Sequence, residues 1–285
     1  MSVPAQTLTE APASARGDIS EVAKLAYPVV LSTIAETLMQ TIDTAMLGHL
    51  GATQLAAAGF AGLWIWTLFV PFTGTAQGVQ SFVSRHDGAG EQDRAGAWIW
   101  QALWLLVPAM TLWMFVVAWF FPKLVAFINP SPELQAAAIP YAYARLFGGP
   151  AVAANFVQMS FFRGIGDTRT PLYVTLGVVS IHLVFAYGLI FGHFGLPAWG
   201  IVGAGVAQSI GSWSFTVIFT VLLSRRKLRE RYRTQPVAPR LADIGRFVRT
   251  SAAIGGQWVL DMTSFALFST IIAGTAPSEV CHDER

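Results

Sequence analysis

The sequence predicts an all-α integral membrane protein with about seven transmembrane helices. Of its 285 residues, 54% are hydrophobic and only 12% are charged, whereas soluble domains carry about 25% charged residues. The apolar residues form stretches long enough to cross a bilayer, and the basic residues fall mainly in the connections on one side. The ten Trp and twenty Phe residues also suit the aromatic belts found at membrane interfaces.

Seven stretches reach the roughly 20 mostly apolar residues that a spanning helix requires. Polar connections containing Gly, Pro, Asn or Asp separate them, as expected of turns. Examples are residues 48–51 after the first stretch and 195–197 after the fifth. The predicted spans are 22–47, 55–83, 96–120, 136–161, 171–193, 198–223 and 250–274.

Lys and Arg residues predict how these spans are oriented. With the N-terminus in the cytoplasm, fifteen basic residues fall on the cytoplasmic side, whereas Lys123 alone lies in an external loop between spans. Cytoplasmic loops of membrane proteins carry such an excess of positive charge. We therefore expect a multi-pass protein of the bacterial cytoplasmic (inner) membrane with a cytoplasmic N-terminus.

The polar segments predict little beyond topology. Residues 1–20 form a polar tail without the features of a cleaved signal peptide. The basic stretch 225–249 is expected to be a cytoplasmic linker that contacts anionic lipid headgroups. The net charge of only +2 gives no reason to expect nucleic acid as a partner. The single cysteine, Cys281, cannot form an internal disulfide.

The first span carries a polar stripe. Glu36, Gln40 and Asp43 follow one another at spacings of four and three residues, which places them on one helix face. A charge at the bilayer centre costs about 2.5–3.5 kcal/mol, so such residues usually mark a pathway. Polar residues can also hold two packed helices together, but two carboxylates on one stripe would repel each other in that role. The stripe therefore favours a site that exchanges protons or binds a cation.

Other polar residues inside the spans leave alternatives open. His182 in the fifth span is either a packed neutral histidine or a group that titrates near neutral pH. Arg145 either extends toward the interface or pairs with a carboxylate. Trp64 is a candidate for cation–π contact with a flat organic cation. In the seventh span Gln257 and Asp261 share one helix face.

Several classes of protein are excluded. No Gly-Lys-Ser/Thr sequence of a phosphate-binding loop is present, and no paired Cys/His spacing indicates a metal site. A retinal protein needs a lysine in its last helix, and the last lysine here is Lys227, before the seventh span. We therefore expect neither an enzyme nor a bound cofactor.

Three motifs resemble one known family. The first span contains Asp-Thr-Ala-Met-Leu-Gly-His-Leu-Gly from Asp43, the fourth ends in Arg-Gly-Ile-Gly-Asp-Thr-Arg-Thr-Pro from Arg163, and the sixth opens with Gly-Ile-Val-Gly-Ala-Gly from Gly200. These resemble the MATE family (multidrug and toxic compound extrusion), and most closely its DinF-like branch. The resemblance covers roughly residues 20–274.

The resemblance implies a function and an architecture. Such proteins have twelve helices in two six-helix lobes and export organic, often cationic, compounds in exchange for H⁺ or Na⁺. By this resemblance Asp43 is a coupling residue, and Asp261 matches an acid that the family often has in helix 7. The implied organisation is an N-terminal lobe at 21–224, the linker, the first helix of a second lobe at 250–274, and an unrelated polar tail at 275–285.

Two departures from the family pattern qualify these expectations. Where the family commonly has Asn and Asp in helix 5, this chain has His182 and Ala186, so His182 is expected to replace a carboxylate. After Gly274 the chain does not continue into an eighth helix, which indicates a truncated product. We therefore expect no transport by this chain alone. The alternatives are a lipid-linked oligosaccharide flippase of the same superfamily and a non-functional remnant.

Overall fold

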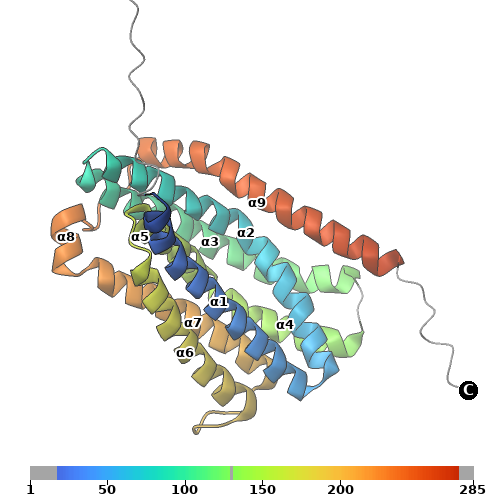
Figure 1. Cartoon of the computed structure of the whole chain (residues 1–285). Helices are drawn as coiled ribbons and strands as arrows, with labels where there is room; N and C mark the ends of the chain where they lie inside the picture. The colour runs from blue at the N-terminus through green and yellow to red at the C-terminus, as the bar shows by residue number, and fades with distance from the viewer. Residues whose placement is uncertain (1–17, 129–130, 276–285) are drawn as a thin grey trace, which may run out of the picture.

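The computed structural model describes residues 18–128 and 131–275, with side chains described over 22–128 and 131–264. Within these ranges the secondary structure is entirely helical (Figure 1). The nine helices are α1 (Asp18–Leu50), α2 (Ala52–Gly88), α3 (Gln92–Ile128), α4 (Pro132–Leu146), α5 (Gly149–Gly164), α6 (Arg169–Phe191), α7 (Gly200–Leu223), α8 (Arg226–Tyr232) and α9 (Leu241–Thr275).

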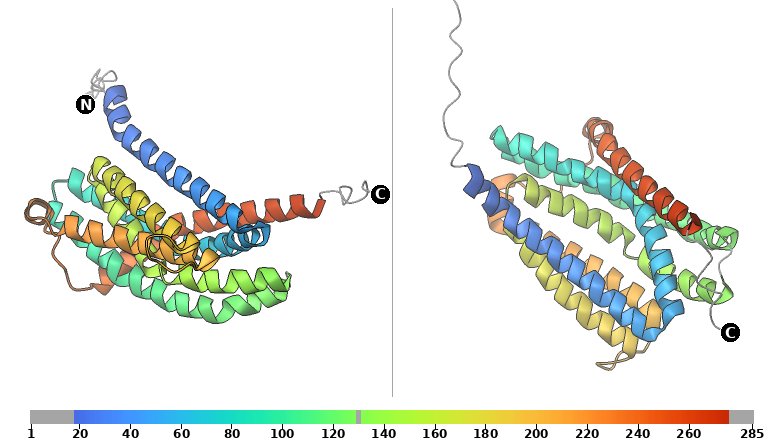
Figure 2. Two further views of the ribbon diagram at one scale, coloured as in Figure 1. Left: turned by 90° about the horizontal axis from the view of Figure 1, so that it is seen from below. Right: turned by 45° about the vertical axis from the view of Figure 1, so that its right-hand side comes forward.

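Helix α2 organises the bundle, because it packs against α3, α4, α5 and α9. Helix α1 lies mainly against α6, which in turn packs along α7 (Figure 1). The right-hand view of Figure 2 shows α1 and α9 on different sides of the bundle. The α1–α6–α7 group therefore forms a layer of its own, and this layer carries most of the polar residues discussed below.

The length and composition of five helices suit a membrane crossing. In the part of the chain that the structure describes, these are Val22–Leu50, Ala52–Gly88, Gln92–Ile128, Arg169–Phe191 and Ile201–Leu223. They correspond to the first, second, third, fifth and sixth predicted spans. The prediction of an all-helical membrane protein is thus confirmed, and the two remaining spans differ from the sequence-based expectation in their helix boundaries.

The fourth predicted span, 136–161, is not one continuous helix. Helices α4 and α5 follow each other end to end, and the chain breaks between them at Phe147 and Gly148. Pro150 has no backbone N–H to donate to the carbonyl of Leu146, so an unbroken helical ladder cannot form there. Ser131 starts α4 by accepting a hydrogen bond from the backbone N–H of Leu134 at 3.4 Å. The span is therefore two short helices joined by a bend.

The segment before the seventh span is more ordered than the predicted linker. Helix α8 lies within it, and α9 begins at Leu241 rather than near residue 250. Side chains of α3 hold the segment between α8 and α9: the indole N–H groups of Trp100 and Trp104 donate to the carbonyls of Thr234 and Val237 at 3.1 and 3.0 Å. Gln101 donates to the carbonyl of Ala238 and accepts from the backbone N–H of Arg240.

Tyr232 anchors α8 to the bundle. Its side chain is buried and its ring meets Phe161 of α5 edge to face, with 5.6 Å between centroids. Burial raises the pKa of the Tyr232 phenol, and the carboxylate of Asp87 adds to the effect. The backbone carbonyl of Tyr232 lies against Gly96 of α3, where an added Cβ atom would collide with it. Position 96 of α3 thus fits only glycine.

Small residues let α9 approach α2 closely. A Cβ atom on Gly74 would lie 3.0 Å from the Cα of Gly255, and one on Gly78 would overlap Ser251. A Cβ on Gly255 would in turn lie 2.7 Å from the Thr75 hydroxyl oxygen and 3.1 Å from the Pro71 carbonyl oxygen. Such contacts between small residues are the usual means of helix association in membranes.

We predict that Gly255→Ala lowers the thermal stability of the chain in detergent. The added methyl group must displace the hydrogen-bonded Thr75 hydroxyl or the Pro71 backbone, and overpacking of this kind costs about 1–3 kcal/mol. Gly256→Ala is the matched control, because a Cβ there meets nothing within 4 Å. Melting followed by fluorescence checks both variants. Equal melting temperatures would show that the α2–α9 contact is looser than described.

Candidate functional site

The polar stripe of α1 lies within one continuous helix, so its spacing holds in the structure. Glu36 and Asp43 are partly buried and Gln40 is exposed. The two acids are seven residues apart, which corresponds to about 10 Å along the helix axis. They therefore occupy two different levels of the bundle and do not converge on one point.

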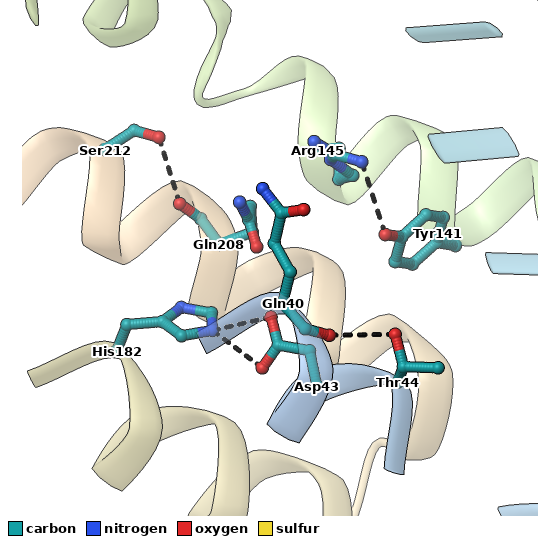
Figure 3. A network of polar contacts seen from close by, with 8 residues as sticks. All are labelled: Gln40, Asp43, Thr44, Tyr141, Arg145, His182, Gln208 and Ser212. Carbon is teal, nitrogen blue, oxygen red and sulfur yellow. Dashed lines mark hydrogen bonds and ion pairs between the residues drawn. The ribbon is translucent and has the colours of Figure 1, made fainter. Parts of the chain in front are cut away.

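Asp43 is bonded to His182 of α6. Both carboxylate oxygens of Asp43 lie 2.9 Å from Nε2 of the imidazole (Figure 3). The His182 side chain is only 2% exposed and that of Asp43 is 19% exposed, so the contact is largely shielded from solvent. On the other side of the ring, α7 passes at Gly211, where a Cβ would lie 3.6 Å from Nδ1. Three helices thus fix the position of this histidine.

Glu36 is influenced by a different basic residue, with which it forms no ion pair. Its carboxylate interacts electrostatically with the guanidinium of Arg163, in the last turn of α5. Nε of Arg163 is buried and has no hydrogen-bond partner among the described residues. The sequence analysis counted Arg163 among the basic residues that set topology and as the start of a family motif, but not as a neighbour of Glu36. Its position at the end of a span, directly before a Gly-x-Gly turn, was a signal that it could also reach inward.

Arg145 contacts an aromatic residue of its own helix. A guanidinium nitrogen lies 3.5 Å from the hydroxyl of Tyr141, and the guanidinium carbon is 5.9 Å from the centre of the same ring. A Cβ on Gly62 of α2 would be 3.1 Å from this guanidinium. Among the described residues Arg145 has no carboxylate partner, so its charge is held within the bundle by an aromatic neighbour.

Figure 3 shows the residues around the Asp43–His182 contact. Gln40 of α1 and Gln208 of α7 extend beside it, and Arg145 lies beyond them. The threonine hydroxyls of α1 are satisfied locally, because those of Thr37, Thr41 and Thr44 each donate to the carbonyl four residues earlier. The amide groups of the two glutamines sit on the same side of the contact as Arg145.

The remaining predicted site residues lie elsewhere. Trp64 of α2 is partly buried and packs against the hydrophobic core. Gln257 and Asp261 are exposed on α9, which packs mainly on α2 rather than on the α1–α6 pair. The structure therefore brings Asp43, His182 and Gln40 together and leaves Trp64, Gln257 and Asp261 apart from them. In the described part of the chain, no group of three His, Cys, Asp or Glu side chains could hold a metal ion.

We predict that Asp43 and His182 are coupled in a double-mutant cycle of stability. Asp43→Ala leaves a buried imidazole without its partner, which costs about 1–3 kcal/mol. In the double variant Asp43→Ala/His182→Leu both polar groups are gone, so the combined loss should be smaller than the sum of the single losses. Unfolding in mixed detergent micelles measures all four proteins, and strictly additive losses would contradict the contact.

Comparison with known proteins gives the family. The MatE family model matches residues 28–188, more than half of the chain, and this region includes α1 through most of α6. The chain is 28% identical over 265 residues to multidrug resistance protein PmpM of Pseudomonas aeruginosa, covering 91% of this chain and 55% of that protein. It is 27% identical over 281 residues to a probable multidrug resistance protein NorM of Xanthomonas campestris, covering 98% and 61%.

Solved structures agree on the fold. The chain matches the crystal structure of the eukaryotic MATE transporter AtDTX14 with a TM-score of 0.80 at 18% identity, covering 90% of this chain and 57% of that one. A MATE crystallised in a straight conformation matches with a TM-score of 0.76 at 20% identity, over 91% and 57% of the two chains. The chain thus spans about half the length of the relatives it matches, and it belongs to the MatE family of membrane transporters, which are not enzymes.

Proposed function

We propose that this chain supplies the coupling lobe of a cation-coupled exporter of organic compounds. The observation that carries the proposal is the buried contact between Asp43 and His182, in which an acid and a base from different helices share hydrogen bonds. A carboxylate inside a membrane usually has a functional role, and it usually faces a pathway or a partner. The relatives named as multidrug resistance proteins support the assignment.

The coupling step would be exchange of an ion at Asp43. Uptake of a proton neutralises the carboxylate and weakens its hold on His182, which releases α1 from α6. An ion can shift the balance between two conformations only by its difference in affinity for them. Breaking one buried charge-assisted contact supplies such a difference. The imidazole gives a proton a second acceptor, and this favours H⁺ over Na⁺ as the coupling ion.

Glu36 and Arg163 would form a second, independent charged pair nearer the other end of α1. Because each acid has its own basic partner, one can change protonation while the other keeps its charge. Gln40 is exposed between them and is available to a bound molecule. We assign Asp43 and His182 to ion coupling and give Glu36 and Gln40 supporting places beside them.

The substrate would be a small organic compound, in most cases a cation. Trp64 has an indole face that could attract a positive charge, although its packing against the core leaves only part of the ring accessible. Gln257 and Asp261 are exposed on α9 and would meet the substrate if the second lobe faces them. Arg145 would contact neutral or anionic parts of a substrate, because it repels cations.

The proposed setting is the cytoplasmic membrane of a bacterium, with the N-terminus in the cytoplasm. The fifteen-to-one distribution of basic residues between the two sides supports this orientation. Membership of the DinF-like branch also remains a proposal, since the relatives described above carry the names PmpM and NorM.

We predict that Asp43→Asn abolishes coupling. The chain is to be fused to the C-terminal half of Pseudomonas PmpM and reconstituted in vesicles, where a pH gradient drives uptake of a fluorescent organic cation. The variant should lose most of the gradient-driven rate, because an amide cannot take up a proton. Asp93→Asn is the control: it also removes an acid, but an exposed one that pairs with Arg233 at 3.0 Å. Uptake by Asp43→Asn at the parent rate would disprove the coupling role.

We also predict that vesicles containing only the 285-residue chain show no gradient-driven uptake. Transporters built from repeats place the substrate site at the repeat interface, and this chain spans about half the length of its relatives. The same dye assay measures this, with empty vesicles as the baseline. Uptake above that baseline would show that the site is complete within one chain or an assembly of identical chains.

A further inference from the structure

A groove on the outer surface of the helix bundle lies between α3, α5 and α7, away from the polar stripe of α1. Its volume is about 580 Å³, within the range of ~300–1,000 Å³ typical of small-molecule sites. Its walls are mostly apolar, and two of its tryptophans, Trp104 and Trp213, are 48% and 38% exposed, so the groove is open to whatever surrounds the bundle. In a membrane-spanning chain that surrounding is lipid.

The groove has the depth of one leaflet. Its wall on α7 extends from Trp213 to Ser224, eleven residues that correspond to about 16 Å of helix. The hydrocarbon core of a bilayer is about 30 Å thick, so one leaflet accounts for about 15 Å. Pro108 on α3 and Pro150 on α5 lie at the inner end with Trp213, whereas Thr234 and Gln235 close the end near α8. An acyl chain of that leaflet fits this length.

Arg229 places a positive charge at the end of the groove near α8. Arg229 of α8 lines both the groove and an adjoining pocket that also includes Arg226 and Arg233. Arg226 is paired with Glu230 at 2.6 Å and Arg233 with Asp93 at 3.0 Å. Among the described residues Arg229 has no acidic partner, so its charge is available to an anion. The hydrogen bonds from α3 to the segment after α8 keep this end of the groove in place.

A buried polar atom also lacks a partner in the groove. The Gln158 side chain is 2% exposed and lines the groove, and its Nε2 donates to the Thr220 hydroxyl at 3.0 Å. Its Oε1 has no hydrogen-bond partner among the described residues. A buried acceptor of this kind costs free energy until a donor reaches it. It is a polar point in the mostly apolar wall of the groove.

We propose that the groove binds an anionic phospholipid of the leaflet on the α8 side. One acyl chain lies between α3, α5 and α7, and the phosphate is bound by Arg229. Phosphatidylglycerol fits best, because its headgroup carries the negative charge that Arg229 requires. Phosphatidylcholine has the same chains but no net charge. The site is independent of the coupling residues and does not rest on the proposed transport activity.

The test is native mass spectrometry of the purified chain after exchange into vesicles with equal amounts of phosphatidylglycerol and phosphatidylcholine. The chain should retain phosphatidylglycerol preferentially. Arg229→Gln should lower this retention about fivefold, the effect expected of one basic residue near a charged membrane surface. Lys227→Gln is the matched control: it removes the same charge from α8, but Lys227 lines neither pocket.

A second pair of variants tests the acyl-chain position. Val107→Trp fills the groove from α3 and should reduce retention of either lipid, whereas Leu112→Trp on the same helix is 68% exposed and lies outside the groove. Equal retention of the two lipids, wild-type retention by Arg229→Gln, or wild-type retention by Val107→Trp would each overturn the proposal. Displacement of the lipid by soluble glycerol phosphate would also overturn it, because the site would then recognise a free anion.

Discussion

A carboxylate inside a bilayer is retained only where a neighbour offsets its lost hydration, and for Asp43 that neighbour is His182. Without such a partner, a charge at the bilayer centre costs about 2.5–3.5 kcal/mol on insertion scales. The 2.9 Å contact therefore fixes more than two side chains. It sets the depth of α1 against α6, and through Gly211 it also determines how closely α7 can approach the imidazole. The contact adds a buried polar link to the packing that already joins these three helices.

The second acid shows the same constraint met differently. The charge of Arg163, in the last turn of α5, acts on Glu36 from a distance, without an ion pair between the two side chains. Two acids on one stripe would repel each other if they shared a site, and separate partners at two levels remove that conflict. The polar stripe thus links α1 to α6 at Asp43, and the two acids have different electrostatic surroundings.

Much of this could be predicted from the chain because the signals were local. The placing of Glu36, Gln40 and Asp43 on one face follows directly from helix periodicity, and the distribution of basic residues predicts an orientation in the membrane. The pairing of Asp43 with His182 joins positions 139 residues apart, and nothing local encodes it. The break before Pro150 was visible as Gly-Gly-Pro within the fourth span but was outweighed by its hydrophobicity. The early start of α9 was hidden by the polar residues between Leu241 and Arg249.

The hydrogen bonds between α3 and the segment that leads into α9 have a mechanical consequence. Without tertiary contacts, the segment between α8 and α9 would be a flexible linker. The distance between the helices that it joins would then be limited only by its length. Here the segment is hydrogen-bonded to one end of α3, through the side chains of Trp100, Gln101 and Trp104. Any rotation of α9 relative to α7 must then pivot at this hydrogen-bonded segment. A motion of this kind changes an angle more than a distance.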